Sequence, residues 1–558
     1  MDTIPSRPSA RLSAIRTPSS VLRSISSILP RCHRDRLSRQ KPSPAMLGHR
    51  VIPSRVACCA LNVKQPSDPS PLLINEDLKP TAVEDRKFTG WDFLGLWIGL
   101  VVSITSYSLA ASLVDLGMSW WQAVLTVFTG NAIVLVPVLL NGFAGTKYGI
   151  PFPVLARSSF GVRGANVAAL LRGLVACGWF GIQTWICADA ISNLVIKFAP
   201  SLATHPPLPF FDITGLQLSC FVFFWLFQVL VLTKGMDSIQ FVERYSAPLL
   251  ISLSLALMIW AVTSAGGFGP MMSKPSEFGV GMAKEGQFWK TFWPSLTANI
   301  GYWATLALNI PDFTRYAKSQ RAQAVGQGVG LPLFMALFSF MGILVTSATT
   351  VIFGEVLTSP IEVLAKMKGY WAVTLGLIGV VIATISTNLA ANVVAPANAL
   401  VNLSPRLFTF PIAAVVTSVI GALLLPWKLI SSTQGYIFTW LIGYSALLGP
   451  MTGIFLADFY LVEKMNLDVD ALYSTDPKDK YWFTGGYNVA ALVSMLAGAL
   501  PSLPGFLEAA GFVKDVPGFF SSIYTVAWFI GFIIGALMYL LILKLSPRRS
   551  EYVPCPES

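Results

Sequence analysis

Glycines and hydroxyl side chains interrupt the first long apolar segment of the chain, which reads Gly95-Leu96-Trp97-Ile98-Gly99-Leu100-Val101-Val102-Ser103-Ile104-Thr105-Ser106. A later apolar segment has a similar mixture with prolines, and it reads Trp293-Pro294-Ser295-Leu296-Thr297-Ala298-Asn299-Ile300-Gly301-Tyr302-Trp303-Ala304 and then Asn309-Ile310-Pro311-Asp312. Interrupted helices at corresponding places in two halves of a membrane protein are typical of a transporter binding site. The two segments are five spans apart, and because five is odd, a repeat of five spans must be inverted across the membrane.

The composition is that of a membrane protein. Of the 558 residues, 54% are apolar and 12% are charged, whereas a soluble protein has about 25% charged residues. The apolar segments are long enough to cross a bilayer as helices. We therefore predict an all-α polytopic membrane protein with twelve transmembrane helices. They span approximately residues 91–112, 119–141, 165–192, 216–233, 246–265, 290–312, 330–353, 371–396, 409–426, 434–461, 485–503 and 522–545.

The basic charge is concentrated in a leader at the N-terminus. Residues 1–60 contain ten arginines and one lysine against two aspartates, which is +9 of the total net charge of +11. A leader that is rich in Arg and Ser and poor in acidic residues is typical of an organellar transit peptide, and Val56–Ala60 resembles a plastid cleavage site. A mitochondrial leader and a disordered cytosolic tail are the alternatives. The excess charge therefore does not indicate a nucleic-acid surface.

The remaining chain divides by composition into three parts. Residues 61–88 are predicted to be a polar linker, 89–546 the twelve-helix transporter domain, and 547–558 a short polar tail. Basic residues gather in the loops after the even-numbered spans and at the C-terminus, so both termini are expected on the cytosol-equivalent side. With a plastid leader, the expected location is the inner membrane of the plastid (chloroplast) envelope.

The third span presents an aromatic ring and an amide on one helical face. Trp179 and Gln183 are four residues apart and so lie one above the other. An indole face and an amide with donors and an acceptor suit a flat, polar, heteroaromatic solute. A lone Trp179 is more often a packing residue, but Gln183 nearby and Trp303 in the other interrupted segment favour a stacking clamp. Trp185 is about 240° around the helix from Trp179 and is expected to pack elsewhere.

The eighth span offers oxygen atoms for a cation. Ala383, Ser386 and Thr387 share one helical face. Two hydroxyl oxygens, together with carbonyls of a broken first helix, suit a hard monovalent cation. Hydroxyls that bond to their own helix or join neighbouring helices are the alternative explanation. Asn392 lies about 7.5 Å further along the axis, where a substrate held by its amide would adjoin a cation at Thr387.

Three motifs resemble those of the nucleobase:cation symporter family 1. The first motif runs from Asn141 to Gly161 and includes Gly145-Thr146-Lys147-Tyr148-Gly149-Ile150-Pro151-Phe152-Pro153-Val154. The second reads Gly178-Trp179-Phe180-Gly181-Ile182-Gln183-Thr184-Trp185, and the third reads Asn309-Ile310-Pro311-Asp312-Phe313-Thr314-Arg315-Tyr316. The resemblance covers approximately residues 86–545, and the motifs follow the family's order.

The resemblance implies a fold and a set of site residues. The fold is a leucine-transporter-type inverted repeat of five plus five helices, followed by two C-terminal helices. The implied substrate-binding residues are Trp179, Gln183, Trp303, Asn392 and Ser103. The implied sodium ligands are the carbonyls of Gly99, Val102 and Ala383 and the hydroxyls of Ser386 and Thr387. Ser103 stands where a hydantoin transporter of the family has a glutamine, and Tyr302 stands where it has a glycine.

The expected function is cation-coupled import of nucleobases of the uracil, adenine and guanine class by alternating access. Related heterocycles (allantoin, hydantoin or cytosine) are alternatives, as is an uncoupled channel or facilitator. The coupling ion is sodium or a proton, for which Asp189 and Asp312 are candidate relays. An enzyme is not expected, because His205 is the only histidine after the leader and no nucleophile–base set is evident. The expected partners are the nucleobase and membrane lipid, without a cofactor.

Overall fold

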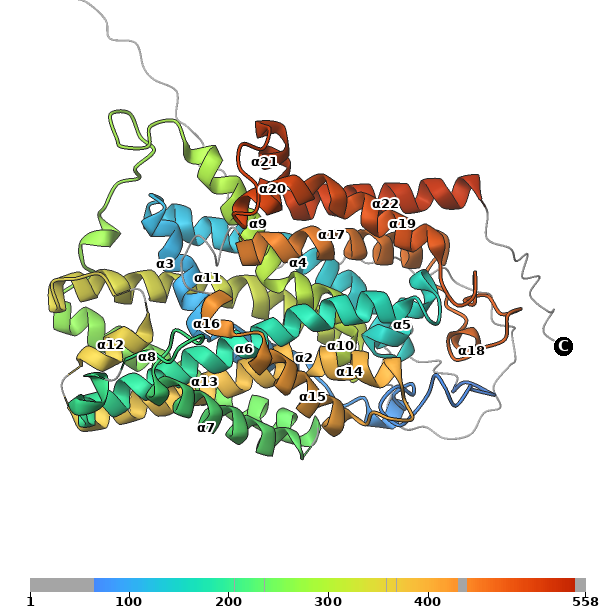
Figure 1. Cartoon of the computed structure of the whole chain (residues 1–558), viewed down its shortest axis with the longest axis horizontal. Helices are drawn as coiled ribbons and strands as arrows, with labels where there is room; N and C mark the ends of the chain where they lie inside the picture. The colour runs from blue at the N-terminus through green and yellow to red at the C-terminus, as the bar shows by residue number, and fades with distance from the viewer. Residues whose placement is uncertain are drawn as a thin grey trace, which may run out of the picture. The chain divides into compact units, whose positions relative to one another are not determined.

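The computed structural model describes residues 65–204, 206–234, 236–357, 359–367, 369–429 and 439–546. The predicted transit peptide and the C-terminal tail at 547–558 lie outside these residues. The described part is almost entirely helical (Figure 1). Its main helices are α2 (Gly90–Val101), α3 (Ile104–Asp115), α4 (Trp120–Tyr148), α6 (Ala165–Phe198), α7 (Gly215–Leu232), α8 (Met236–Ala265), α9 (Phe288–Asn309), α11 (Gln320–Ile352), α13 (Tyr370–Asn392), α14 (Val394–Leu403), α15 (Phe410–Leu423), α17 (Ile442–Leu456), α19 (Val489–Ala499) and α22 (Ala527–Leu545).

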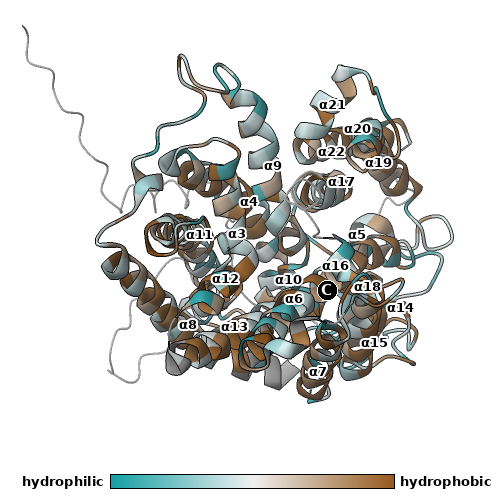
Figure 2. Cartoon of the chain, turned by 60° about the vertical axis from the view of Figure 1, so that its left-hand side comes forward, coloured by the Kyte–Doolittle hydropathy of each residue, from teal (hydrophilic) through white to brown (hydrophobic). Residues whose placement is uncertain are grey.

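Each of the twelve predicted spans overlaps a helix in the part of the chain that the structure describes. Within the described ranges, nine helices are long and apolar enough to cross a membrane, or ten if the bent pair α2–α3 is one span. The other two predicted spans correspond to α9 and to the shorter apolar helix α15. Hydrophobic residues predominate along most of the helices (Figure 2), and large apolar side chains such as Phe223, Leu230 and Leu537 are exposed. Such an exterior suits a lipid environment.

The predicted interruption of the first span is confirmed. Helix α2 ends at Val101, α3 begins at Ile104, and the two axes are bent by 60°. Ser103 has extended backbone angles and is the N-cap of α3, where its side chain accepts from the backbone of Ser106. Serine stabilises a new helix start at this position because its hydroxyl pairs with a backbone N–H that would otherwise have no partner. The break therefore arises from the local sequence.

The predicted interruption of the sixth span lies at Ile310 and not within residues 293–304. Helix α9 is continuous from Phe288 to Asn309, and the chain deviates only at Ile310, before the short helix α10 (Pro311–Thr314). Pro294 lies in the second turn and removes one backbone hydrogen bond of α9. The Asn299 amide donates to the Ser295 carbonyl within the helix at 2.9 Å, and the Tyr444 hydroxyl of α17 donates to the Gly301 carbonyl at 2.9 Å. A spanning helix tolerates proline under these conditions.

The packing pairs of the first five spans recur in the second five. Helix α2 packs against α11 as α9 packs against α4, and α2 packs against α8 as α9 packs against α17. The pair α6–α7 corresponds in the same way to α14–α15. Helices α19 and α22 pack against α17, outside this pattern. This correspondence is what an inverted repeat of five plus five helices requires.

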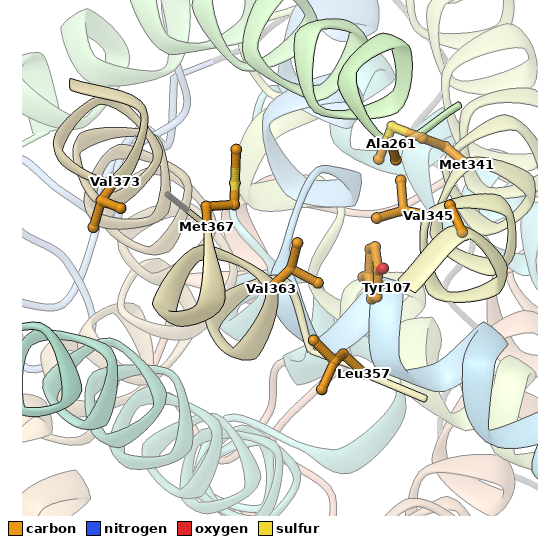
Figure 3. Packing of buried hydrophobic residues seen from close by; sticks show 9 residues of the cluster. Tyr107, Ala261, Met341, Val345, Leu357, Val363, Met367 and Val373 are labelled. Atoms are coloured by element: carbon orange, nitrogen blue, oxygen red, sulfur yellow. The ribbon is translucent and has the colours of Figure 1, made fainter. Parts of the chain in front are cut away.

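An apolar cluster joins the short helix α12 (Pro360–Lys366) to the spans around it. Val363 of α12 is fully buried beside Tyr107 of α3, Val345 of α11 and Val373 of α13 (Figure 3). Ala261 of α8 completes the contact. Helix α12 thereby covers one end of the group formed by α3, α8, α11 and α13.

Residues 65–88, which we call the N-terminal strap, lie along the opposite end, near α14, α15 and the short helix α18 (Val469–Leu472) (Figure 1). The Arg315 guanidinium donates to the Asp77 carbonyl and the Lys79 carbonyl, both at 2.8 Å, and to the Thr81 hydroxyl at 2.7 Å. The Asp77 carboxylate accepts from the backbone of Phe410 at the start of α15. The segment predicted as a linker is therefore bound to α15 and to the segment that follows α10.

Arg157 in the short helix α5 (Phe152–Phe160) is a second anchor of the strap. Its fully buried guanidinium donates to the carbonyl of Leu73 at 2.8 Å and to the side-chain oxygen of Asn402 at 2.6 Å. Burial lowers the pKa of Arg157 to about 10, so the group keeps its charge at neutral pH. Hydrogen bonds to a charged group are stronger than neutral ones, so the strap is held by two buried cations.

Candidate functional site

Helix α6 places Trp179 and Gln183 in the interior, against the break in the first span. Both side chains are buried, with 5% and 2% of their surface exposed. The Gln183 amide donates to the Thr105 hydroxyl at 3.0 Å. The Trp179 ring meets the Tyr302 ring edge-on, with 5.4 Å between centroids. The shared face predicted from their spacing therefore points toward α3 and α9. Trp185 packs instead on Trp427 at 5.3 Å, as predicted.

Glycines let neighbouring helices approach this face closely. A side-chain carbon at Gly178 would lie 2.5 Å from the Trp440 ring, and Trp440 in turn contacts Trp179 at 6.1 Å between ring centroids. Only a residue without a side chain fits at such a contact. The Trp179 ring therefore contacts both Trp440, just before α17, and Tyr302 of α9.

The two tryptophans predicted to form a clamp meet the same tyrosine. Trp303 is 2% exposed, and its ring lies 4.9 Å from that of Tyr302 and 5.2 Å from that of Trp97, both edge-on. Tyr302 thus contacts Trp179 and Trp303 simultaneously. Sequence reasoning noted Tyr302 only as a neighbour of Trp303 and did not place it in the site. Its position depends on the rotation of α9 against α6, which no local pattern reveals.

Four hydroxyl groups gather at the break. The Tyr302 hydroxyl is 3.2 Å from Ser103 Oγ, 2.6 Å from Thr105 Oγ1 and 3.0 Å from Ser106 Oγ. Ser103, predicted to adjoin the substrate, is therefore part of a cluster that also receives the Gln183 amide through Thr105. Hydroxyls can both donate and accept, so this cluster can change partners without leaving a polar group unpaired.

Asn392 belongs to a network of buried amides. Its Nδ2 donates to Asn388 Oδ1 at 2.9 Å, and Asn388 Nδ2 donates to Gln228 Oε1 at 2.7 Å and to Thr184 Oγ1 at 3.2 Å. The network joins α6, α7 and α13. Sequence reasoning singled out Asn392 alone. Asn388 lies one turn earlier on the same face of α13. This pair of asparagines is the sequence feature that could have indicated an amide network.

The predicted cation ligands converge where α2 meets α13. The Thr387 hydroxyl donates to the Gly99 carbonyl at 3.0 Å, and Val102 and Ala383 belong to one buried cluster. Ser386 Oγ lies 3.0 Å from Ser246 Oγ of α8. The donors are neutral carbonyl and hydroxyl oxygens, which fit a hard monovalent cation better than a transition metal. Ser246 is a further oxygen that the sequence did not indicate.

A cavity of about 320 Å³ adjoins the same break on its far side from Trp179. Val102, Ser103 and Ala383 form its wall beside the predicted cation ligands, and its other lining residues, such as Leu250 and Trp260, come mainly from apolar positions. The break in the first span is therefore bordered by polar groups toward α6 and α9 and by an apolar space toward α8.

A buried charged group lies two helical turns from Trp179 on α6. The Arg172 guanidinium donates to Asn309 Oδ1 at 2.7 Å, and Asn309 Nδ2 donates to Asp312 Oδ2 at 3.1 Å. Asp312 also accepts from the backbone of Phe152 at 2.9 Å. The network ties α6 to α9, α10 and α5. Asp189, the other predicted relay candidate, accepts from Gln217 Nε2 at 3.0 Å near the opposite end of α6.

The fold and these buried polar sites define a polytopic membrane transporter. The family described as "Permease for cytosine/purines, uracil, thiamine, allantoin" matches residues 80–531. The chain belongs to this family, the nucleobase:cation symporter family 1. The resemblance predicted from the three motifs is thereby confirmed. Family members are permeases and not enzymes, in agreement with the sequence prediction.

Two curated relatives are similar over most of their length. The chain is 51% identical over 481 residues to the purine-uracil permease NCS1 of Arabidopsis thaliana, covering 86% of this chain and 79% of the relative. It is 39% identical over 497 residues to the allantoin permease of Bacillus subtilis, covering 88% and 97%.

A solved structure shares the fold. This is the nucleobase-cation-symport-1 transporter Mhp1 in a closed conformation with bromovinylhydantoin bound, with a TM-score of 0.68 and 23% identity over 86% of this chain and 98% of that one. The inward-facing conformation of Mhp1 matches with a TM-score of 0.66. This likeness confirms the predicted fold class.

Proposed function

We propose that the protein is a secondary active transporter that imports nucleobases of the uracil, adenine and guanine class by cation-coupled alternating access. The observation that carries the proposal is that Trp179 and Trp303 both contact the Tyr302 ring, while the Tyr302 hydroxyl and the Gln183 amide both bond Thr105 at the break of the first span. Aromatic faces and an amide recognise flat rings with N–H and C=O groups. Offset stacking contributes about 0.5–1.5 kcal/mol for each aromatic pair beyond burial.

The relatives support this class of substrate. The Arabidopsis relative is a purine-uracil permease at 51% identity, whereas the Bacillus relative at 39% is an allantoin permease. Allantoin, hydantoin and cytosine are therefore the second set of candidate substrates. All of these are small, planar or nearly planar heterocycles that the same rings and amides could hold.

We propose that Asn392 completes the substrate site and that Ser103 adjoins the substrate. The coupling cation, sodium or a proton, would act at the α2–α13 contact. A sodium ion there would be held by the carbonyls of Gly99, Val102 and Ala383 and the hydroxyls of Ser386 and Thr387. Such an ion would neutralise the partial charges of the carbonyls at the break and stabilise its geometry.

Uptake into proteoliposomes tests the function. The purified chain is assayed with uracil, adenine, guanine, cytosine, allantoin and hydantoin, with and without a sodium gradient and with a pH gradient. We expect saturable nucleobase uptake that depends on one of the two gradients. Counterflow separates a transporter from a channel, because only a transporter accelerates uptake when unlabelled substrate is inside. Uptake that does not saturate and shows no counterflow would support a channel instead.

We further propose that the protein resides in the plastid inner envelope. The arginine- and serine-rich leader at residues 1–60 supports this location. A fluorescent fusion of the full chain is expected to label the plastid envelope, and removal of residues 1–60 is expected to abolish that labelling. Mitochondrial labelling would correct the organelle, and unchanged plastid labelling after removal would contradict the assignment of the leader.

A further inference from the structure

Tyr302 occupies the meeting point of the site. Its ring is 6% exposed and contacts the rings of Trp179 and Trp303, the two residues proposed to flank the substrate. Both contacts are edge-on, at 78° and 84° between ring planes. A flat solute that stacks on either indole face must therefore pack against the Tyr302 ring or displace it. The size and orientation of this ring limit what the two tryptophans can hold.

The hydroxyl of Tyr302 has an equally specific environment. It lies within 3.2 Å of three other hydroxyls, those of Ser103, Thr105 and Ser106, all in the first turn after the break. The Gln183 amide donates to the same cluster at Thr105. Within the described part of the chain, the buried Gln183 Oε1 has no hydrogen-bond partner. An acceptor without a partner beside four exchangeable hydroxyls is well suited to receive the N–H of an incoming heterocycle.

The same cluster adjoins the proposed cation ligands. Ser103 follows Val102 directly in the chain, and Gly99 one turn earlier accepts the Thr387 hydroxyl at 3.0 Å. A change of hydrogen-bond partner at Ser103 therefore acts on the Val102–Ser103 peptide, and the Val102 carbonyl of that peptide is proposed to bind the cation. Tyr302 is the residue of α9 that contacts both the aromatic pair and this break.

We propose that Tyr302 is the specificity-determining residue of the site and that its hydroxyl connects substrate binding to the broken first span. The ring sets the room available between the two tryptophans. The hydroxyl exchanges its bonds with Ser103, Thr105 and Ser106 for a polar atom of the substrate, and this exchange changes the geometry of the break. The inference rests on the proposed transport function, since it names the residue that selects among the heterocycles.

Two substitutions separate the ring from the hydroxyl. In Tyr302→Phe the ring remains, and Ser103 keeps its own bonds to Thr105 at 3.2 Å and Ser106 at 2.9 Å, so the fold is preserved. We expect the KM for the transported heterocycle to rise about 3- to 10-fold, as for a lost hydrogen bond, and its dependence on the coupling ion to weaken. In Tyr302→Ala the site widens, and we expect uptake of a uracil with a benzyl group at C5, which the unaltered protein excludes.

Tyr107→Phe is the matched control. Tyr107 is also buried on this segment and also bonds a hydroxyl, that of Thr346 at 3.0 Å, but it faces the apolar cluster (Figure 3). The Tyr107→Phe variant should keep the substrate preference and ion dependence of the unaltered protein. The proposal is overturned if Tyr302→Phe keeps both the KM and the ion dependence, or if Tyr302→Ala excludes the bulky uracil while still transporting uracil.

The test of Tyr302 can fail or succeed independently of the test of the nucleobase assignment. The same variants are assayed with whichever of uracil, adenine, guanine, cytosine, allantoin and hydantoin the unaltered protein transports. If only allantoin or hydantoin is taken up, the nucleobase assignment fails. The Tyr302 comparison is then made with hydantoin and with a hydantoin that carries a benzyl group at C5, and the same criteria apply.

Discussion

The Thr387 hydroxyl provides a direct test of cation coupling. It is buried, with 3% of the residue exposed, and it donates to the Gly99 carbonyl at 3.0 Å. Thr387→Ala removes one of five proposed oxygen ligands. A lost ligand of this kind is comparable to a lost hydrogen bond to a charged group, about 1.5–3 kcal/mol, which corresponds to about a 10- to 150-fold weaker cation affinity.

The assay is uracil uptake into proteoliposomes as a function of sodium concentration. Thr387→Ala is expected to need about 10- to 150-fold more sodium for half-maximal uptake, while Thr387→Ser, which keeps the hydroxyl, stays near the unaltered value. Thr417→Ala is the control for loss of a buried threonine, because Thr417 bonds only its own helix, at Ala413, in the described structure. Equal sodium dependence in all four proteins would refute the assignment. Uptake that ignores sodium and follows pH would assign the coupling to protons.

Three further predictions concern the site, the strap and a helix contact. Gln183→Ala should raise the KM for nucleobases at least tenfold in the same uptake assay, and an unchanged KM would remove Gln183 from the site. Arg315→Gln should accelerate amide hydrogen exchange in residues 65–88, because three hydrogen bonds to the strap are lost, whereas exposed Arg321→Gln should leave exchange unchanged. Gly301→Ala should lower the melting temperature by several degrees because an added methyl collides with α17, whereas Gly328→Ala, with open space around it, should not.

Local chemistry made much of the fold predictable. The break between α2 and α3 was visible because Ser103 is a strong helix N-cap and glycines precede it. The same reasoning failed for α9, because the continuity of a helix through Pro294 and Gly301 depends on its partners. Tyr444 donates its hydroxyl to the carbonyl of Gly301 at 2.9 Å, and that contact comes from a helix far along the chain.

In the candidate site, too, local features were predictable from sequence and contacts between helices were not. The shared face of Trp179 and Gln183 was predictable because residues four positions apart on a helix lie on the same side. The proposed ligand roles of Gly99 and Val102 came from the family resemblance rather than from spacing. Ser246 and the Arg172–Asn309 pair were missed, and the contacts of Tyr302 were not predicted, because these depend on the rotation and depth of packed helices. Sequence periodicity predicts which residues of a helix face the interior. It does not predict which of those residues contact one another.

The linker at residues 61–88 illustrates a third limit. Prolines and polar residues correctly predicted that much of it is not helix, but they did not reveal that buried Arg157 and Arg315 bind its backbone carbonyls. Backbone acceptors carry no side-chain signature. A segment recognised mainly through its carbonyls therefore reads as featureless in sequence.

The most direct test of the account compares two tryptophans on the same helix. Trp179→Ala and Trp185→Ala are reconstituted in equal amounts, and counterflow of labelled uracil and adenine is measured. Trp179 faces Tyr302 in the proposed site, whereas Trp185 packs on Trp427 away from it. We predict that Trp179→Ala abolishes counterflow while Trp185→Ala retains it. Counterflow at the unaltered rate in Trp179→Ala would contradict the account.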